Sequence, residues 1–221
     1  MKKHKTKCRT LLDAVENIDE SYLGDLTYYY RILIEKATNL SLLYHGLTHI
    51  NRVLWYCYIG GLHYMREGRL TAIQFRILLI AALFHDFNHS GKLEDDRKQI
   101  TRAIKALRKH ILDSDRPYLR DIEEVMWATL FPYGEEVVSL SGCIIRDADM
   151  TQALDLTWMG INLVGLSMEW KITFKEMLLR QEPFLKGMKL ESGWGRNTFP
   201  QHMINEKIRQ ARQLRRILCV E

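Results

Sequence analysis

The stretch Phe84-His85-Asp86-Phe87-Asn88-His89-Ser90-Gly91 constrains this chain more than any other. It directly follows the apolar run from Phe75 to Leu83, which predicts one buried helix. Two imidazoles and a carboxylate at the end of a buried helix are costly to desolvate unless they bind something. A metal ion takes neutral imidazole nitrogens and carboxylate oxygens as ligands. The stretch therefore predicts a metal site that other segments complete.

Length and composition predict one domain. The chain has 221 residues, of which 47% are apolar and 27% charged, as is usual for a globular protein. It has only 4 prolines and no linker rich in Pro, Gly or Ser. We expect a helical N-terminal segment over residues 1–39, a core over 40–155, and C-terminal helices over 156–221 that complete the same domain.

The sequence also carries an expectation about location. No run of about 18 apolar residues occurs, so we expect no membrane span. The basic N-terminus is not followed by an apolar stretch, which argues against export. The cysteines form no CxxC pair and predict free thiols in a reducing cytoplasm. They are Cys8, Cys57, Cys143 and Cys219.

The net charge of +5 comes from the two ends of the chain. The excess lies in the first seven residues and in Lys207–Arg216. Such ends suit an anionic partner, and a basic helix can bind nucleic acid. Ordinary solvated surface charge explains them equally well, and the sequence leaves the oligomeric state open.

Apolar periodicity predicts an all-α fold, with no alternating strand pattern. The expected helices run over about 11–36, 42–60, 71–84, 95–111, 121–130, 151–160, 173–186 and 203–220. Gly60-Gly61 is a plausible helix stop and Thr71 a plausible N-cap. The segment 191–197 reads as a loop.

Two further segments carry ligand-type residues in apolar surroundings. His45 and His49 are four residues apart, so a helix would place them on one face. Asp147 and Asp149 lie in the apolar segment 137–154. The other histidines stand in polar or irregular contexts and are expected at the surface. They are His4, His63, His110 and His202.

In this order of ligand-type residues the chain resembles the HD superfamily of metal-dependent phosphohydrolases, and within it the cyclic-nucleotide phosphodiesterase type. The matching segments cover about residues 40 to 155. They are Tyr44-His45-Gly46-Leu47-Thr48-His49, His85-Asp86-Phe87-Asn88-His89-Ser90-Gly91, Ala128-Thr129 and Ala148-Asp149-Met150. The resemblance implies an all-α HD-type bundle with a dinuclear metal site in its core.

The resemblance also implies metal ligands. The first metal would be held by His49, His85, Asp86 and Asp149. Asp86 would bridge to a second, more water-rich metal. The two divalent ions could be manganese, magnesium, zinc or iron. Asp147 would then lie outside the ligand set or cap a helix.

Catalytic roles follow from the same resemblance. His45 would donate a proton to the leaving oxygen, and His89 would orient the bridging water. Asp86 acts through the metals. A histidine suits general-acid work near neutral pH. Thr129 would face the pocket without a firm role.

Substrate recognition is less well defined. The chain has no clear counterpart of the glutamine that clamps the purine in these phosphodiesterases. Gln181 is a candidate, but we expect it to be a surface glutamine at a helix end. Arg146, His110 and Lys92 could each reach a substrate phosphate. An aromatic set could stack on a base, but such residues more often fill a core. It comprises Trp127, Phe131, Tyr133, Trp158, Trp170 and Trp194.

The sequence thus predicts a metal-dependent phosphohydrolase that cleaves a phosphoester of a nucleotide or cyclic nucleotide. His45 favours a diester, because a poor leaving group gains most from a proton donor. The alternatives are a nucleotide phosphomonoesterase on the same scaffold, a diiron oxygenase of the HD type, and a non-catalytic module that binds nucleotide or nucleic acid. Only His110 lies where further iron ligands would be expected, which weakens the oxygenase.

Overall fold

The computed structural model describes residues 26–132, 137 and 139–219, and these residues are all-helical, without a strand. The α-helices are α2 (Leu26–Lys36), α3 (Leu47–Arg66), α4 (Ala72–Phe84), α5 (Asp96–His110), α6 (Leu119–Trp127), α7 (Leu140–Met150), α8 (Leu166–Trp170), α9 (Phe174–Gly187), α10 (Gly193–Thr198) and α11 (Gln201–Ile217). Three short segments complete them: η1 (Arg116–Tyr118), η2 (Thr151–Leu154) and the π-helical η3 (Met159–Gly165).

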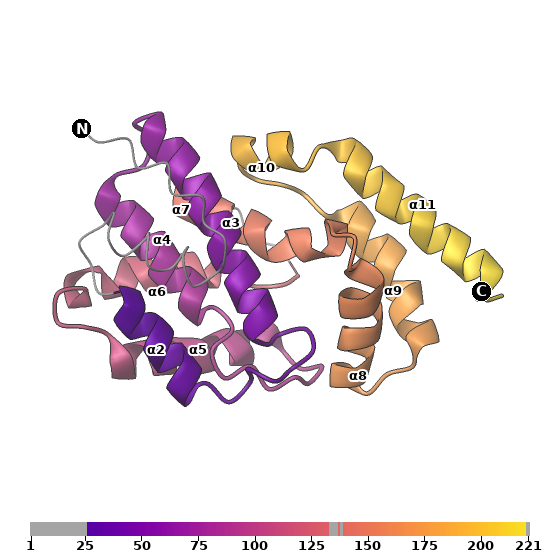
Figure 1. Ribbon diagram of the computed structural model, residues 1–221, viewed down its shortest axis with the longest axis horizontal. Coiled ribbons are helices and arrows are strands. Elements are labelled where there is room, and N and C mark those ends of the chain that lie inside the picture. The colour runs from indigo at the N-terminus through magenta and orange to yellow at the C-terminus, as the bar shows by residue number, and fades with distance from the viewer. Residues whose placement is uncertain (1–25, 133–136, 138, 220–221) are drawn as a thin grey trace.

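The main core is built around α4. Nine of its thirteen residues are buried, which confirms that the apolar run is one buried helix. Helices α2, α3, α6 and α7 pack around it, as the indigo-to-pink half of Figure 1 shows. Thr71 caps its N-terminus, as predicted, by accepting a hydrogen bond from the Gln74 amide. The helix ends at Phe84, so His85 and Asp86 emerge from the centre of the bundle.

The C-terminal helices have a smaller core of their own. Its buried residues are Trp158, Leu163, Leu166, Met177, Leu178 and Ala211, from the turn before η3 and from η3, α8, α9 and α11. Figure 1 shows α8, α9 and α11 beside the bundle, with α10 at the upper edge between α3 and α11. The site described below is lined by both parts.

Three local predictions were wrong. Helix α3 does not stop at Gly60-Gly61 but continues to Arg66. A Cβ on Gly60 would lie 2.8 Å from Cε3 of Trp194, and one on Gly61 would lie 2.3 Å from Cε2 of Phe75. The two glycines therefore let α10 and α4 approach α3 closely, rather than ending the helix.

The other two errors lie in the C-terminal part. No single helix runs over 151–160: η2 ends at Leu154 and η3 begins only at Met159. The predicted loop 191–197 contains α10, whose N-cap Ser192 accepts a hydrogen bond from the Gly195 amide. The predicted helix over 11–36 is described only from Leu26, because its earlier part lies outside the described residues.

Among the residues that the structure describes, no helix is both long enough and apolar enough to cross a membrane.

Candidate metal centre

Three separate segments bring the predicted metal ligands together. His49 lies in the first turn of α3, His85 and Asp86 follow α4, and Asp149 lies near the end of α7. One atom each of His49, His85 and Asp149 falls within a 4.8 Å group that could hold a metal ion. Asp86 joins them, with its Oδ2 3.4 Å from Nε2 of His49 and 3.5 Å from Nε2 of His85.

The spacing of these atoms suits a shared ion. Nε2 of His49 lies 3.3 Å from Nε2 of His85 and 3.0 Å from Oδ1 of Asp149. Ligands about 2.1 Å from a metal stand roughly 3.0 Å apart in an octahedron and roughly 3.4 Å apart in a tetrahedron. The distances from Nε2 of His49 to the other three donor atoms are therefore those of neighbouring ligands in a coordination shell.

Hydrogen bonds fix the tautomers of two histidines. Nδ1 of His85 lies 2.8 Å from the carbonyl oxygen of Ala82, and Nδ1 of His49 lies 2.6 Å from Oε1 of Gln152. An oxygen of this kind only accepts, so each Nδ1 donates its proton. In the neutral form of either ring the lone pair is then on Nε2, on the side of the carboxylates, which is the arrangement of a metal-binding histidine.

The carboxylate of Asp86 indicates whether a metal ion fits among these residues. Its Oδ2 atom is buried and has no hydrogen-bond partner. Burial raises the pKa of this carboxyl, but the charges of His85, His45 and His89 bring it below its ordinary value. A buried, ionised oxygen without a donor is costly. A cation among the four donors would remove that cost, so the residues present fit a divalent metal.

His49 carries a proton in the absence of metal. Burial lowers the pKa of His49, but the hydrogen bond with Asp149 and the charges of Asp86 and Asp149 raise it to about 9. A metal bound here must therefore displace that proton.

His45 lies beside this group but not on the helical face that the sequence predicts. Helix α3 begins at Leu47, so His45 belongs to the preceding loop and not to a helical turn shared with His49. The N-cap Gly46 cannot carry a side chain, because a Cβ there would lie 2.1 Å from the carbonyl oxygen of Leu42. The ring centroids of His45 and His49 are nevertheless only 6.1 Å apart.

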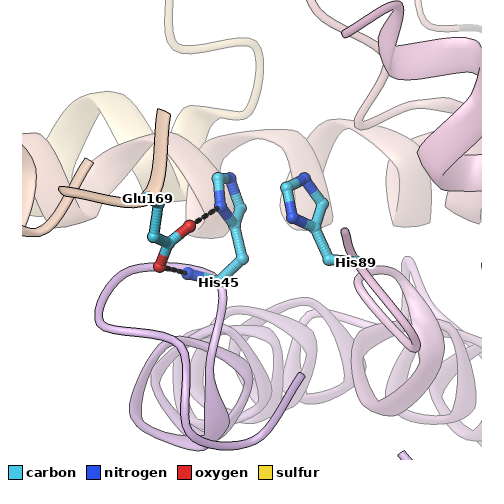
Figure 2. A group of neighbouring side chains, drawn as sticks. All are labelled: His45, His89 and Glu169. Carbon is cyan, nitrogen blue, oxygen red and sulfur yellow. Dashed lines mark hydrogen bonds and ion pairs between the residues drawn. The ribbon is translucent and has the colours of Figure 1, made fainter. Parts of the chain in front are cut away.

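Glu169 at the end of α8 holds His45 in place, as Figure 2 shows. Its Oε2 lies 2.8 Å from Nδ1 of His45, and its Oε1 accepts from the backbone amides of Tyr44 and His45. Burial raises the pKa of Glu169, but its hydrogen bond and ion pair with His45 lower it overall. Glu169 is therefore an ionised carboxylate that holds the ring and the backbone of His45 in place.

His89 stacks on His45 on the side away from Glu169 (Figure 2), with ring centroids 3.6 Å apart. The amide of Gly91 donates to Nδ1 of His89 over 3.1 Å. Burial and the charge of His45 lower the pKa of His89 to about 3. The ring is thus neutral with its proton on Nε2, so His89 can donate a hydrogen bond there but offers no lone pair to a metal.

A cavity of about 930 Å³ is lined by these residues. His45, Asp86, His89 and Asp149 line it, whereas His49 and His85 are buried and are absent from its lining. Thr129 lines it as the resemblance implies, and its hydroxyl donates to the carbonyl oxygen of Met126. The C-terminal helices supply one wall, which includes Asn162, Leu166, Trp170, Met177, Gln181 and Phe184.

The prediction that Gln181 is a surface glutamine is wrong. It is only 4% exposed and lines the cavity. Its Nε2 contacts Sδ of Met177 at 3.3 Å and the Met177 carbonyl oxygen at 3.5 Å. Its Oε1 is buried without a partner.

Of the residues predicted to contact phosphate, the structure places only some at the cavity. Lys92 lines the cavity, and so does Arg180. Arg146 is instead buried and donates to the carbonyl oxygen of Ala128 over 2.7 Å. His110 is not among the cavity residues.

Asp147 lies outside the cluster. Its carboxylate accepts from the amides of Glu191 and Ser192, so it fastens the segment before α10 to α7. Burial raises its pKa to about 6 despite those hydrogen bonds.

The aromatic set divides between core and cavity. Trp158 and Trp194 are buried in the two cores, whereas Phe131 and Trp170 line the cavity. Tyr133 and His4 lie outside the described residues. His202 is exposed, as predicted, whereas His63 is half-buried.

Sequence reasoning missed three residues that hold the site together. Glu169 and Gln152 orient His45 and His49. Asn39, which is 1% exposed, donates to the carbonyl oxygens of His45 and Asp86 and so ties two site segments together. A single Glu, Gln or Asn is not part of a recognisable sequence motif. The partners of these three residues are either far away in the sequence or backbone atoms.

No protein-family model matches this chain, and a search of the curated proteins found no match either.

Proposed function

We propose that the chain is a metal-dependent phosphohydrolase of the phosphodiesterase type, acting on a nucleotide or cyclic nucleotide. The observation that carries the proposal is the donor set of His49, His85, Asp86 and Asp149, in which Nε2 of His49 and Nε2 of His85 lie 3.4 Å and 3.5 Å from a buried Asp86 oxygen that has no hydrogen-bond partner. The motif resemblance to the HD superfamily supplies the reaction class.

The four donors would hold the first metal ion, and Asp86 would be shared with a second. Bound divalent metal would supply Lewis-acid chemistry, which activates water and neutralises charge on the phosphate. Deep burial of His49 and His85 keeps these ligands out of water and fixed in orientation.

Proton donation to the leaving group falls to His45. It lines the cavity, and its Nδ1 lies 2.8 Å from Oε2 of Glu169, which leaves Nε2 as the nitrogen that can serve a substrate. His89 offers a neutral Nε2–H beside it and can hydrogen-bond a phosphate oxygen. A built proton donor favours a diester substrate, whose alkoxide leaving group is poor.

The far wall of the cavity suits the base of a nucleotide. Gln181 offers a buried amide oxygen, and the ring of Phe184 lines the same cavity for stacking. Lys92 and Arg180 supply positive charge for phosphate.

The test is hydrolysis of bis(p-nitrophenyl) phosphate beside a panel of cyclic and linear nucleotides. Each substrate is run with Mn²⁺, with Mg²⁺ and with chelator. We expect metal-dependent turnover that disappears in Asp86→Ala and persists in Asp113→Ala, a matched control whose carboxylate is 96% exposed. Absence of turnover by the metal-loaded wild type on every substrate would refute the proposal.

A diiron oxygenase is the second candidate, because His45, His89 and Glu169 form another group that could hold a metal. The hydrogen bonds favour proton transfer over ligation there, since Nδ1 of His89 accepts from Gly91 and both oxygens of Glu169 are engaged. Iron in the aerobically purified protein together with oxygen-dependent turnover would favour this candidate.

A non-catalytic nucleotide-binding module is the third. Tight nucleotide binding by metal-loaded protein without hydrolysis would favour it over both enzymes.

A further inference from the structure

A groove lies between α9 and α11, outside the cavity of the candidate metal centre. The two helices pack against each other and run side by side in Figure 1, in orange and yellow. The groove has a volume of about 400 Å³, within the range of small-ligand sites, and it shares no lining residue with the cavity. It is therefore a separate place where a ligand can bind.

The lining of this α9–α11 groove is positively charged. Lys186 comes from α9, whereas Arg209 and Arg212 come from α11, and all three side chains are exposed. The other described lining residues are uncharged, and they are Leu185, Gln201, Asn205 and Ile208. Cations on both walls of a groove attract an anionic ligand.

A largely buried carboxylate fixes two of the three cations. Oε1 of Glu182 lies 2.8 Å from Nζ of Lys186 and 2.6 Å from Nη2 of Arg212. The two cations, one from each helix, are therefore held within reach of the same oxygen atom. A ligand finds them already in place, which lowers the conformational entropy that binding costs.

The ion pairs beside the groove do not cancel its charge. Arg209 pairs with Glu206, and Arg215 lies 3.7 Å from the other oxygen of Glu182. Four cations in all thus stand against two carboxylates. A guanidinium has five N–H donors and an ammonium has three, so one carboxylate partner leaves donors for a phosphate group.

The exposed face of α11 favours nucleic acid over a membrane as the anionic partner. From Gln201 to Arg216, every exposed side chain of this helix is polar or charged. Binding to a lipid surface requires apolar side chains that enter the membrane, and none is exposed along this part of α11. Arg209, Arg212 and Arg216 are instead three or four residues apart, roughly 4.5–6 Å along the helix axis, so they can meet successive phosphates.

The shape and lining of the groove favour a single strand. A single strand can lie between the two helices and present its phosphates to both walls, whereas a duplex is too broad to enter a groove of this volume. The described lining contains no aromatic ring on which a base could stack. Contact is therefore with the phosphate backbone, which carries no sequence information.

We infer that the α9–α11 groove is a binding site for the phosphate backbone of a single-stranded nucleic acid. Lys186, Arg209 and Arg212 contact the phosphates. The groove contains none of the candidate metal ligands, so this binding requires neither a metal ion nor the proposed hydrolysis.

The experiment follows the fluorescence anisotropy of a labelled oligothymidylate of about 15 nucleotides, near the upper end of known single-strand sites, as the full chain is added. Chelator is present throughout, so that metal-dependent hydrolysis cannot affect the result. The variants are Arg209→Gln and the triple replacement Lys186→Gln, Arg209→Gln and Arg212→Gln. A charge-matched control replaces three exposed lysines of α5, as Lys98→Gln, Lys105→Gln and Lys109→Gln. A duplex of the same oligonucleotide and vesicles of anionic phospholipid are the alternative ligands.

We expect the wild type to bind the single strand, with an affinity that falls about 20-fold between about 50 and 200 mM salt, as three phosphate contacts imply. At about 100 mM salt each lost contact should weaken binding roughly fivefold. Arg209→Gln should therefore lose about fivefold and the triple variant about 100-fold. The α5 variant should bind nearly as the wild type does.

Four results would overturn the inference. They are no binding by the wild type, unchanged binding in both groove variants, an equal loss in the triple variant and the α5 variant, and tighter binding of duplex or vesicles than of the single strand. Arg209→Gln leaves the pairs of Glu182 with Lys186 and Arg212 intact, so it decides the question even if the triple variant does not fold.

Discussion

At the scale of single residues, the partner of Nδ1 decides the role of each histidine in the cluster. In His49 and His85 that atom donates to a neutral oxygen, which leaves a lone pair on Nε2. In His45 it faces a carboxylate, and in His89 it accepts from a backbone amide. Under the proposed function, this arrangement suits two histidines for metal binding and two for hydrogen bonds to a substrate.

Replacing Glu169 by Gln tests the role of His45. One amide oxygen cannot serve both the ring and the two backbone amides that Glu169 now serves, and it lacks the charge that stabilises imidazolium. We expect turnover of a nucleotide diester to fall roughly 100-fold. Turnover of bis(p-nitrophenyl) phosphate should fall much less, because its leaving group needs no proton.

The metal content of Glu169→Gln should equal that of the wild type, and the exposed Glu35→Gln is its control. An equal loss on both substrates would mean that Glu169 only supports the fold.

His49 couples metal binding to pH. Its pKa of about 9 in the metal-free protein means that it is protonated at neutral pH, and the metal must displace that proton. The apparent metal affinity should therefore rise with pH up to about 9, by up to tenfold per unit. Calorimetry in buffers of different ionisation enthalpy should detect about one proton released at pH 7. Affinity that is flat from pH 6 to 8.5 would contradict this.

At the scale of elements, one buried carboxylate joins α7 to the segment before α10. Asp147 accepts two backbone amides, and a Cβ on Gly195 would lie 2.1 Å from its Oδ2. Asp147→Ala would leave both amides unpaired and should cost about 3 kcal/mol of stability in chemical denaturation. Asp147→Asn keeps an acceptor and should cost less.

The pKa of Asp147 adds a pH test. It is raised to about 6, so the folded state binds a proton more tightly than the unfolded state. This carboxyl should therefore take stability away as the pH rises from about 4 to 6, and Asp147→Asn should lack that loss. An Asn variant with the same pH profile as the wild type would contradict the assignment.

The elements that the sequence predicted correctly are those whose signals are local. The apolar run of α4 and the cap at Thr71 needed no tertiary information. The errors arose where the structure depends on contacts between residues far apart in the sequence. An example is Gly60, against which the ring of Trp194 packs. Glu169 was missed because the histidine with which it forms a hydrogen bond is 124 residues away in the sequence.

At the scale of the whole molecule, the site joins two packed units. The bundle supplies the candidate metal ligands and His45, whereas the C-terminal helices supply Glu169 and, in the cavity wall, Asn162 and Gln181. Motif spacing could predict the first set, because those ligands stand in short patterns. It could not predict the second set, which depends on how η3, α8 and α9 pack against the bundle.

Because the ligands come from α3, α4 and α7, metal binding should stabilise the whole fold. Four donors, one of them a buried oxygen without a partner, gain their common partner only in the folded chain. At a metal concentration of about 100 times Kd the folded state gains about 2.7 kcal/mol, which for a chain of this size raises Tm by roughly 5–10 °C. Chelator should reverse the shift in differential scanning calorimetry. Asp86→Ala should lose it and Asp113→Ala should keep it; an equal rise in Asp86→Ala would place the stabilising ion elsewhere.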